Sequence, residues 1–228
     1  MTDWHAPLVS LLLAVALGLT APLAAAQPSA EPEGDQPSVP RPGAEPEALP
    51  DPEAGPAARP QSTEDEAVLS RARLDALFAR LARNDNPDWL SVQNEIWAQW
   101  SQSGSPAMDL LLRRAESAME TGRFELALRF LDDLVRLAPD FAEGWNKRAT
   151  VYFLLGDYGR SVADIQRTLA LEQRHFGALS GLGMILERLG DQNGAMRAYR
   201  HGLEVHPNLP GAAEGVERLA PDVDGREL

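Results

Sequence analysis

Apolar residues recur along residues 108–209 in a pattern that repeats itself twice. Gly122, Gly156 and Gly190 are 34 residues apart. Within each interval, apolar residues return every three or four positions on both sides of the glycine, which predicts two amphipathic helices joined by a turn. A repeat of this length and content predicts an all-α helix–turn–helix solenoid of three units.

The repeating positions also agree in size. The fourth position of each unit is large (Leu111, Trp145, Leu179), and the eighth is small (Ala115, Ala149, Gly183). Small residues are expected where two helix backbones approach closely. The units are predicted at 108–141, 142–175 and 176–209. Their first helices are expected at about 108–121, 142–155 and 176–189, and their second helices at about 124–137, 158–171 and 192–205.

Two shorter segments flank the repeats. Residues 63–107 carry two apolar helical faces, one containing Leu77 and Phe78 and the other containing Trp97 and Trp100. We interpret this segment as a degenerate helical hairpin that caps the N-terminal end of the solenoid, because terminal units are atypical. Residues 210–220 are predicted to form a C-terminal capping helix that stops at Pro221, and 221–228 a polar tail.

The N-terminal part has a different composition. Residues 1–26 contain a short apolar block followed by Ala-Ala-Ala, which is typical of a secretory signal peptide cleaved after Ala26. No Lys or Arg precedes the block, so an uncleaved membrane anchor is the alternative. Residues 27–62 are rich in Pro, Glu and Ala and are predicted to be a disordered linker. The chain is therefore expected to be exported.

The overall composition excludes several classes of function. The formal net charge of −13 argues against a non-specific nucleic-acid binder, which would need to neutralise phosphates. The chain has no cysteine, which excludes disulfides, thiol catalysis and thiolate metal sites. We expect no stable membrane insertion unless the signal peptide is retained.

The sequence contains no catalytic constellation that we can identify. His201, Glu204 and His206 are close in sequence, but Pro207 ends the helix before one face can present all three to a metal. His175 is expected to pack on the surface at a repeat junction. We therefore predict a non-enzyme without metal or cofactor.

The repeats resemble a known family. The run from Trp145 to Ala149, followed by Tyr152 and by Gly156-Asp157-Tyr158, is similar to the tetratricopeptide repeat (TPR). The resemblance covers a little under half of the chain. It implies a curved stack whose concave face is formed by the first helix of each unit and binds another protein.

The family pattern assigns four positions of each unit to that face. Here they are Asp109, Leu112, Glu116 and Met119, then Glu143, Asn146, Thr150 and Phe153, and finally Gly177, Ser180, Met184 and Glu187. The resulting surface is apolar and acidic, so we expect a partner segment with apolar anchors and Lys or Arg. Phe153 and Met184 have a second interpretation, which is packing between repeats.

These observations predict a protein-binding adaptor or scaffold that acts in the periplasm or cell envelope. The alternative is a self-assembling structural protein, a weak homodimer that uses Trp89, Trp97 and Trp100 of the N-terminal hairpin as its contact face.

Overall fold

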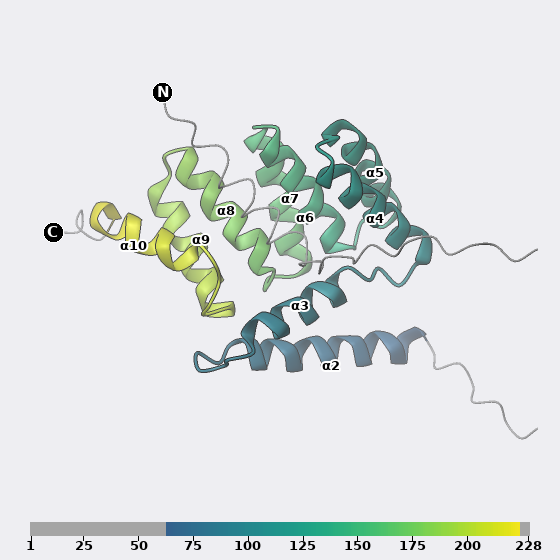
Figure 1. Ribbon diagram of the computed structural model, residues 1–228, viewed down its shortest axis with the longest axis horizontal. Coiled ribbons are helices and arrows are strands. Elements are labelled where there is room, and N and C mark those ends of the chain that lie inside the picture. Colours follow the sequence, from purple (N-terminus) through teal and green to yellow (C-terminus); the bar gives the residue numbers. More distant parts are fainter. Residues whose placement is uncertain (1–62, 224–228) are drawn as a thin grey trace, which may run out of the picture.

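A computed structural model describes residues 63–223, with side chains from residue 68 onward (Figure 1). Throughout this range the regular structure is α-helical, as the sequence predicts. No helix in it is long and apolar enough to cross a membrane. The predicted signal peptide, the predicted linker and the end of the tail lie outside the described residues.

The helices are α2 (Thr63–Leu81), α3 (Trp89–Trp100), α4 (Pro106–Glu120), α5 (Phe124–Leu137), α6 (Ala142–Leu154), α7 (Tyr158–Leu171), α8 (Phe176–Arg188), α9 (Gln192–Val205) and α10 (Ala212–Val223).

Helices α4 to α9 form the three repeated hairpins, and their ends lie within two residues of the predicted positions. In each hairpin the turn contains a glycine with positive φ, namely Gly122 at 68°, Gly156 at 78° and Gly190 at 82°. A side chain would strain this left-handed backbone, so the repeating glycine ends one helix and allows the next to begin.

The hairpins stack in chain order, and each first helix contacts the first helix of the next unit, α4 with α6 and α6 with α8. The shared core is closely packed. Gly183 of α8 lies against the ring of Tyr199 from α9, so the predicted need for a small residue at this position is confirmed. The first helices of successive units therefore lie side by side along one side of the stack, which is the side that the family resemblance assigns to the concave face.

The N-terminal hairpin does not occupy the predicted capping position before α4. Instead, α2 and α3 run beneath the stack, and their connecting turn lies near the end of α9 (Figure 1). Trp97 and Trp100 pack on Phe176 at the start of α8, with ring centroids 5.3 and 5.0 Å apart. The prediction of an N-terminal cap was wrong, because these large side chains find an apolar partner far along the chain.

Helix α10 packs on α9 at the C-terminal end, but its ends differ from the prediction. Gly211, at φ 76°, delays its start to Ala212. The helix also continues past Pro221 to Val223. A proline near the end of a helix forfeits one backbone hydrogen bond. The packing of half-buried Val223 against the apolar core accounts for this extension.

Candidate functional site

The concave face of the repeats carries the residues that the sequence assigned to partner binding, but it exposes only some of them. Thr150, Phe153 and Met184 are partly exposed apolar or weakly polar side chains. Asp109, Glu116 and Glu187 are also partly exposed. The remaining assigned side chains are buried in the structure as it stands: Leu112, Met119, Glu143, Asn146 and Ser180.

A small depression lies between α6 and α8 on this face. It has a volume of about 40 Å³, and Thr150, Phe153 and Gly181 are among its lining residues. Gly181 leaves the depression open, because a Cβ there would meet its nearest neighbour, Cδ1 of Ile165, only at 3.7 Å. The sequence offered no packing reason for this mid-helix glycine, and the structure shows that nothing presses against it.

Phe153 occupies both of the roles considered for it. Its ring packs against Tyr158 at a centroid distance of 5.8 Å, and the guanidinium of Arg188 lies 5.2 Å above it. The ring nevertheless lines the depression and stays partly exposed. Met184 similarly packs against the core while remaining partly exposed. Both residues therefore belong to the face and to the packing between helices.

The acidic residues of the face have partners within the chain. Glu116 lies 2.9 Å from Nζ of Lys147, and Glu187 lies 2.7 Å from the guanidinium of Arg218 on α10. The hydrogen bond from Arg218 lowers the pKa of Glu187 below its ordinary value. Asp109 accepts hydrogen bonds from the backbone and hydroxyl of Ser103, at 2.8 and 2.6 Å. These pairs reduce the negative potential that a basic partner would meet.

Glu143 belongs to a buried network rather than to the open face. Its Oε1 lies 3.3 Å from Nζ of Lys147, and its Oε2 lies 3.0 Å from Nε2 of His175. All three side chains are at most 2% exposed. Burial alone would raise the pKa of Glu143, but Lys147 and His175 outweigh it and hold that pKa below its ordinary value. Burial would likewise lower the pKa of Lys147, but the two carboxylates raise it.

The N-terminal hairpin covers this network. The indole of Trp100 stacks on the His175 ring at 4.1 Å with an interplanar angle of 7°. Trp97 lies over Gly177, where a Cβ would come within 2.6 Å of its ring, and its centroid is 5.8 Å from Nζ of Lys147. The prediction that His175 packs on the surface was wrong, because its ring is fully buried against Trp97, Trp100 and Glu143.

Two of the three tryptophans named for the alternative function are not free to form a contact face, because Trp97 and Trp100 are each only 8% exposed. Trp89 packs against His206 at a centroid distance of 5.4 Å and stays partly exposed. His206 is itself buried and hydrogen-bonded to Gln93 of α3 at 2.9 Å, whereas His201 is exposed. In the described part of the chain no group of His, Asp and Glu residues could hold a metal ion.

Comparison with known proteins places this geometry in a family. The sequence model of the tetratricopeptide repeat matches residues 112–167 and 146–213. A TPR repeat-containing protein of Rhizobium etli is 42% identical over 156 residues, which cover 68% of this chain and 76% of the relative. That alignment is longer than the stretch from residue 108 to the end of the chain, so it extends into residues that precede the first repeat.

More distant proteins share the fold. The Hsp70-Hsp90 organizing protein of Triticum aestivum is 29% identical over 103 residues, which are 45% of this chain and 18% of that protein. The first TPR of Spaghetti, bound to an HSP90 peptide, superposes with a TM-score of 0.50 at 20% identity, covering 51% of this chain and 93% of that one. The Sgt2 TPR domain from Aspergillus fumigatus gives 0.50 at 22% identity, covering 54% and 83%.

Proposed function

Because the chain belongs to the tetratricopeptide repeat family, we propose that it is a non-enzymatic adaptor that binds a segment of another protein on the concave face of its repeats. The observation that carries this proposal is the depression between α6 and α8, with Thr150, Phe153 and Gly181 in its lining. A shallow apolar pit beside a flexible methionine suits the anchoring side chain of a bound peptide.

The partner is expected to contribute an apolar anchor first and basic residues second. The carboxylates of Glu116 and Glu187 are partly exposed, so a Lys or Arg of the partner can share them with Lys147 and Arg218. Such exposed or shared ion pairs contribute little, about 0–1 kcal/mol each. The first TPR of Spaghetti holds an HSP90 peptide, and from that likeness we take only that this fold accommodates a peptide.

The proposal is tested by filling the depression without disturbing the fold. Gly181→Leu places a side chain where the backbone now has none, and leucine is a better helix former than glycine. Ala163→Leu, on an exposed position of α7, is the matched control. Charge reversal at Glu143 is unsuitable, because it would break the buried network with Lys147 and unfold the site.

The measurement is quantitative affinity capture with the unaltered chain, Gly181→Leu and Ala163→Leu as baits, with each bait checked for helicity by circular dichroism. We expect partner proteins that the unaltered chain and Ala163→Leu retain and Gly181→Leu loses. Equal capture by all three folded baits would show that the concave depression is not the binding site.

We further propose that the adaptor acts after export, in the periplasm or cell envelope. This part rests on the apolar block and Ala-Ala-Ala motif of residues 1–26. N-terminal sequencing of the protein purified from its native cells is expected to begin at Gln27. A mature protein that still begins at Met1 would support a membrane anchor instead.

A further inference from the structure

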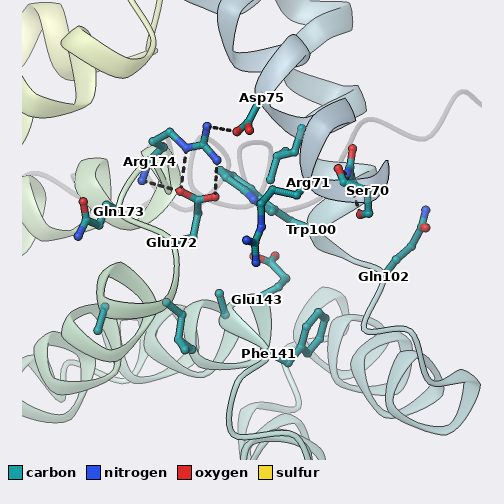
Figure 2. Close-up of a pocket in the computed structure, with 15 residues that line it drawn as sticks. Ser70, Arg71, Asp75, Trp100, Gln102, Phe141, Glu143, Glu172, Gln173 and Arg174 are labelled. Carbon is teal, nitrogen blue, oxygen red and sulfur yellow. Dashed lines mark hydrogen bonds and ion pairs between the residues drawn. The ribbon is translucent and has the colours of Figure 1, made fainter. Parts of the chain in front are cut away.

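A second and larger cleft lies outside the concave face, between the N-terminal hairpin and the junctions of the repeats. Its volume is about 650 Å³. The repeats contribute residues 141–143 and 170–174, and the hairpin contributes Ser70, Arg71, Leu74, Asp75, Gln99, Trp100 and Gln102. Figure 2 shows these two walls facing each other, with Arg174 bound to both Glu172 and Asp75 across the top.

The charged residues in the walls are satisfied by one another, with one exception. Arg174 lies 3.0 Å from Glu172 and 2.7 Å from Asp75, and Glu143 is held by Lys147 and His175. Arg71 is the one charged residue lining this cleft for which the described structure shows neither an ion pair nor a hydrogen bond. Its side chain extends from α2 into the cleft (Figure 2).

Two further polar groups of the α3 wall are unsatisfied. Trp100 is only 8% exposed, and its Nε1 donor has no acceptor. Gln99 donates to the backbone and the hydroxyl of Ser70, but its buried Oε1 acceptor has no donor. Buried donors and acceptors are nearly always paired in native proteins. Both atoms are fully buried, so they are not part of the cleft surface that a ligand meets.

The opposite wall contains the start of helix α6 at Ala142. The carboxylate of Glu143 lies in the first turn of that helix and offsets the partial positive charge of its end. The wall also presents apolar surface from Phe141 and Leu171, and Leu74 of the hairpin lines the same cleft. The cleft thus combines a guanidinium that has no partner among the described residues with an apolar lining.

We infer that this cleft is a second binding site, which takes an extended peptide segment of a partner protein in which a carboxylate stands beside an apolar side chain. The carboxylate pairs with Arg71, and the apolar side chain lies in the part of the cleft that Leu74 and Phe141 line. This occupant is opposite in charge to the one expected on the concave face. The two sites can therefore hold different segments.

The test uses a displayed library of random heptapeptides, selected on the full chain and then on the Arg71→Glu variant. Arg71 is exposed, so its replacement leaves the fold intact. The matched control is Arg73→Glu, which makes the same charge change two residues along α2 and does not line this cleft. We expect enriched sequences in which Asp or Glu adjoins Leu, Phe or another apolar residue.

Binding of the enriched peptides, made synthetically, is then measured from the tryptophan fluorescence of the full chain. Removal of a charge-assisted hydrogen bond predicts an affinity loss of about ten-fold or more with Arg71→Glu. Glu→Gln in the peptide should give a similar loss. The control Arg73→Glu and the depression variant Gly181→Leu should change the affinity less than two-fold, roughly within the error of such measurements.

Three results would overturn the inference. The first is enrichment of basic peptides, and the second is enrichment of acidic peptides that bind the Arg71→Glu variant equally well. The third is binding that appears only after the Asp and Glu residues of 27–62 are replaced by Asn and Gln, which would make the chain's own acidic segment the occupant. None of these results bears on the concave depression, so the two sites are tested separately.

Discussion

The concave face and the hairpin junction, where α2 and α3 pack on the repeats, are both surfaces between packed helices. The contacts that create them differ greatly in the sequence separation of their partners. The concave face arises from neighbouring hairpins, such as α6 on α8. The hairpin junction depends on the Asp75–Arg174 ion pair and the Gln93–His206 hydrogen bond, whose partners are 99 and 113 residues apart in sequence. Contacts between neighbouring hairpins follow from the repeating unit itself. Contacts between the N-terminal hairpin and the repeats need side chains that are specific to this chain.

The two regions also treat polar groups differently. On the concave face the carboxylates of Glu116 and Glu187 already have cationic partners. At the hairpin junction, the described part of the chain provides no ion pair or hydrogen bond for the guanidinium of Arg71. A surface that is internally paired gains little from a charged ligand, because the ligand must compete with existing partners. The guanidinium of Arg71 therefore marks the hairpin cleft as the more charge-selective site.

The largest effect is expected from breaking the network that joins the two regions. Lys147→Met leaves the buried carboxylate of Glu143 without its cation, and it removes the charge near the Trp97 ring. Removing one partner of a buried ion pair costs about 3–5 kcal/mol. Urea unfolding of the variant should show that decrease in the free energy of unfolding.

The control for this change is Arg136→Met, which removes an exposed ion pair with Asp133 on α5. Exposed pairs contribute about 0–1 kcal/mol, so this variant should unfold almost like the original chain. Equal losses in the two variants would mean that the Glu143–Lys147 network is not the link between the hairpin and the repeats.

An intermediate effect is expected from pH, and it should appear at the hairpin junction first. Burial lowers the pKa of His206 from 6.5 to about 4. The unfolded chain therefore binds a proton between these values while the folded chain does not, so stability falls as pH drops from 6.5 toward 4. The loss is at most roughly 3 kcal/mol. Hydrogen exchange should show α3 losing protection before α5 does.

His206→Gln is the variant that sharpens this prediction. Glutamine keeps hydrogen-bonding groups near Gln93 but does not titrate, so stability should become nearly independent of pH between about 4.5 and 6.5. The carboxyl of Glu143 has a lowered pKa, so its own contribution is lost only at more acidic pH, below its ordinary value of 4.5. An unchanged pH dependence in the variant would assign the effect to another group.

The helices of the repeats could be predicted closely because each hairpin is determined by residues near one another in sequence. Apolar spacing and one glycine per turn fix each hairpin, and the column of small residues fixes how neighbouring helices stack. The position of the N-terminal hairpin could not be derived in this way. Gln93 and Trp100 stand where a stacking unit needs small residues, which was the available signal that this hairpin packs elsewhere.

The candidate site was predictable only in outline. Thr150, Phe153 and Met184, which helical position assigned to the partner-binding face, are partly exposed in the structure. Helical position gave no warning that Glu143 lies beneath the hairpin, because the burial depends on Trp97 and Trp100. Nor could it identify Arg71, whose role follows from which charges around it are already paired. Which charged side chains form ion pairs depends on the folded structure and cannot be inferred from residue spacing along the chain.

The smallest changes in stability are expected from replacing two glycines of α8, Gly181 and Gly183, whose surroundings the sequence alone barely distinguishes. Gly181 faces the open depression, so Gly181→Ala should stabilise the helix by about 0.5–1 kcal/mol. Gly183 lies against the Tyr199 ring, so Gly183→Ala should instead destabilise the protein by about 1–3 kcal/mol through overpacking. Thermal unfolding of the two variants should shift the midpoint in opposite directions. A lower midpoint for Gly181→Ala would mean that the concave face is not open at Gly181, and the depression proposed to anchor a partner would lose its physical basis. A higher midpoint for Gly183→Ala would instead mean that the contact with the Tyr199 ring tolerates a methyl group.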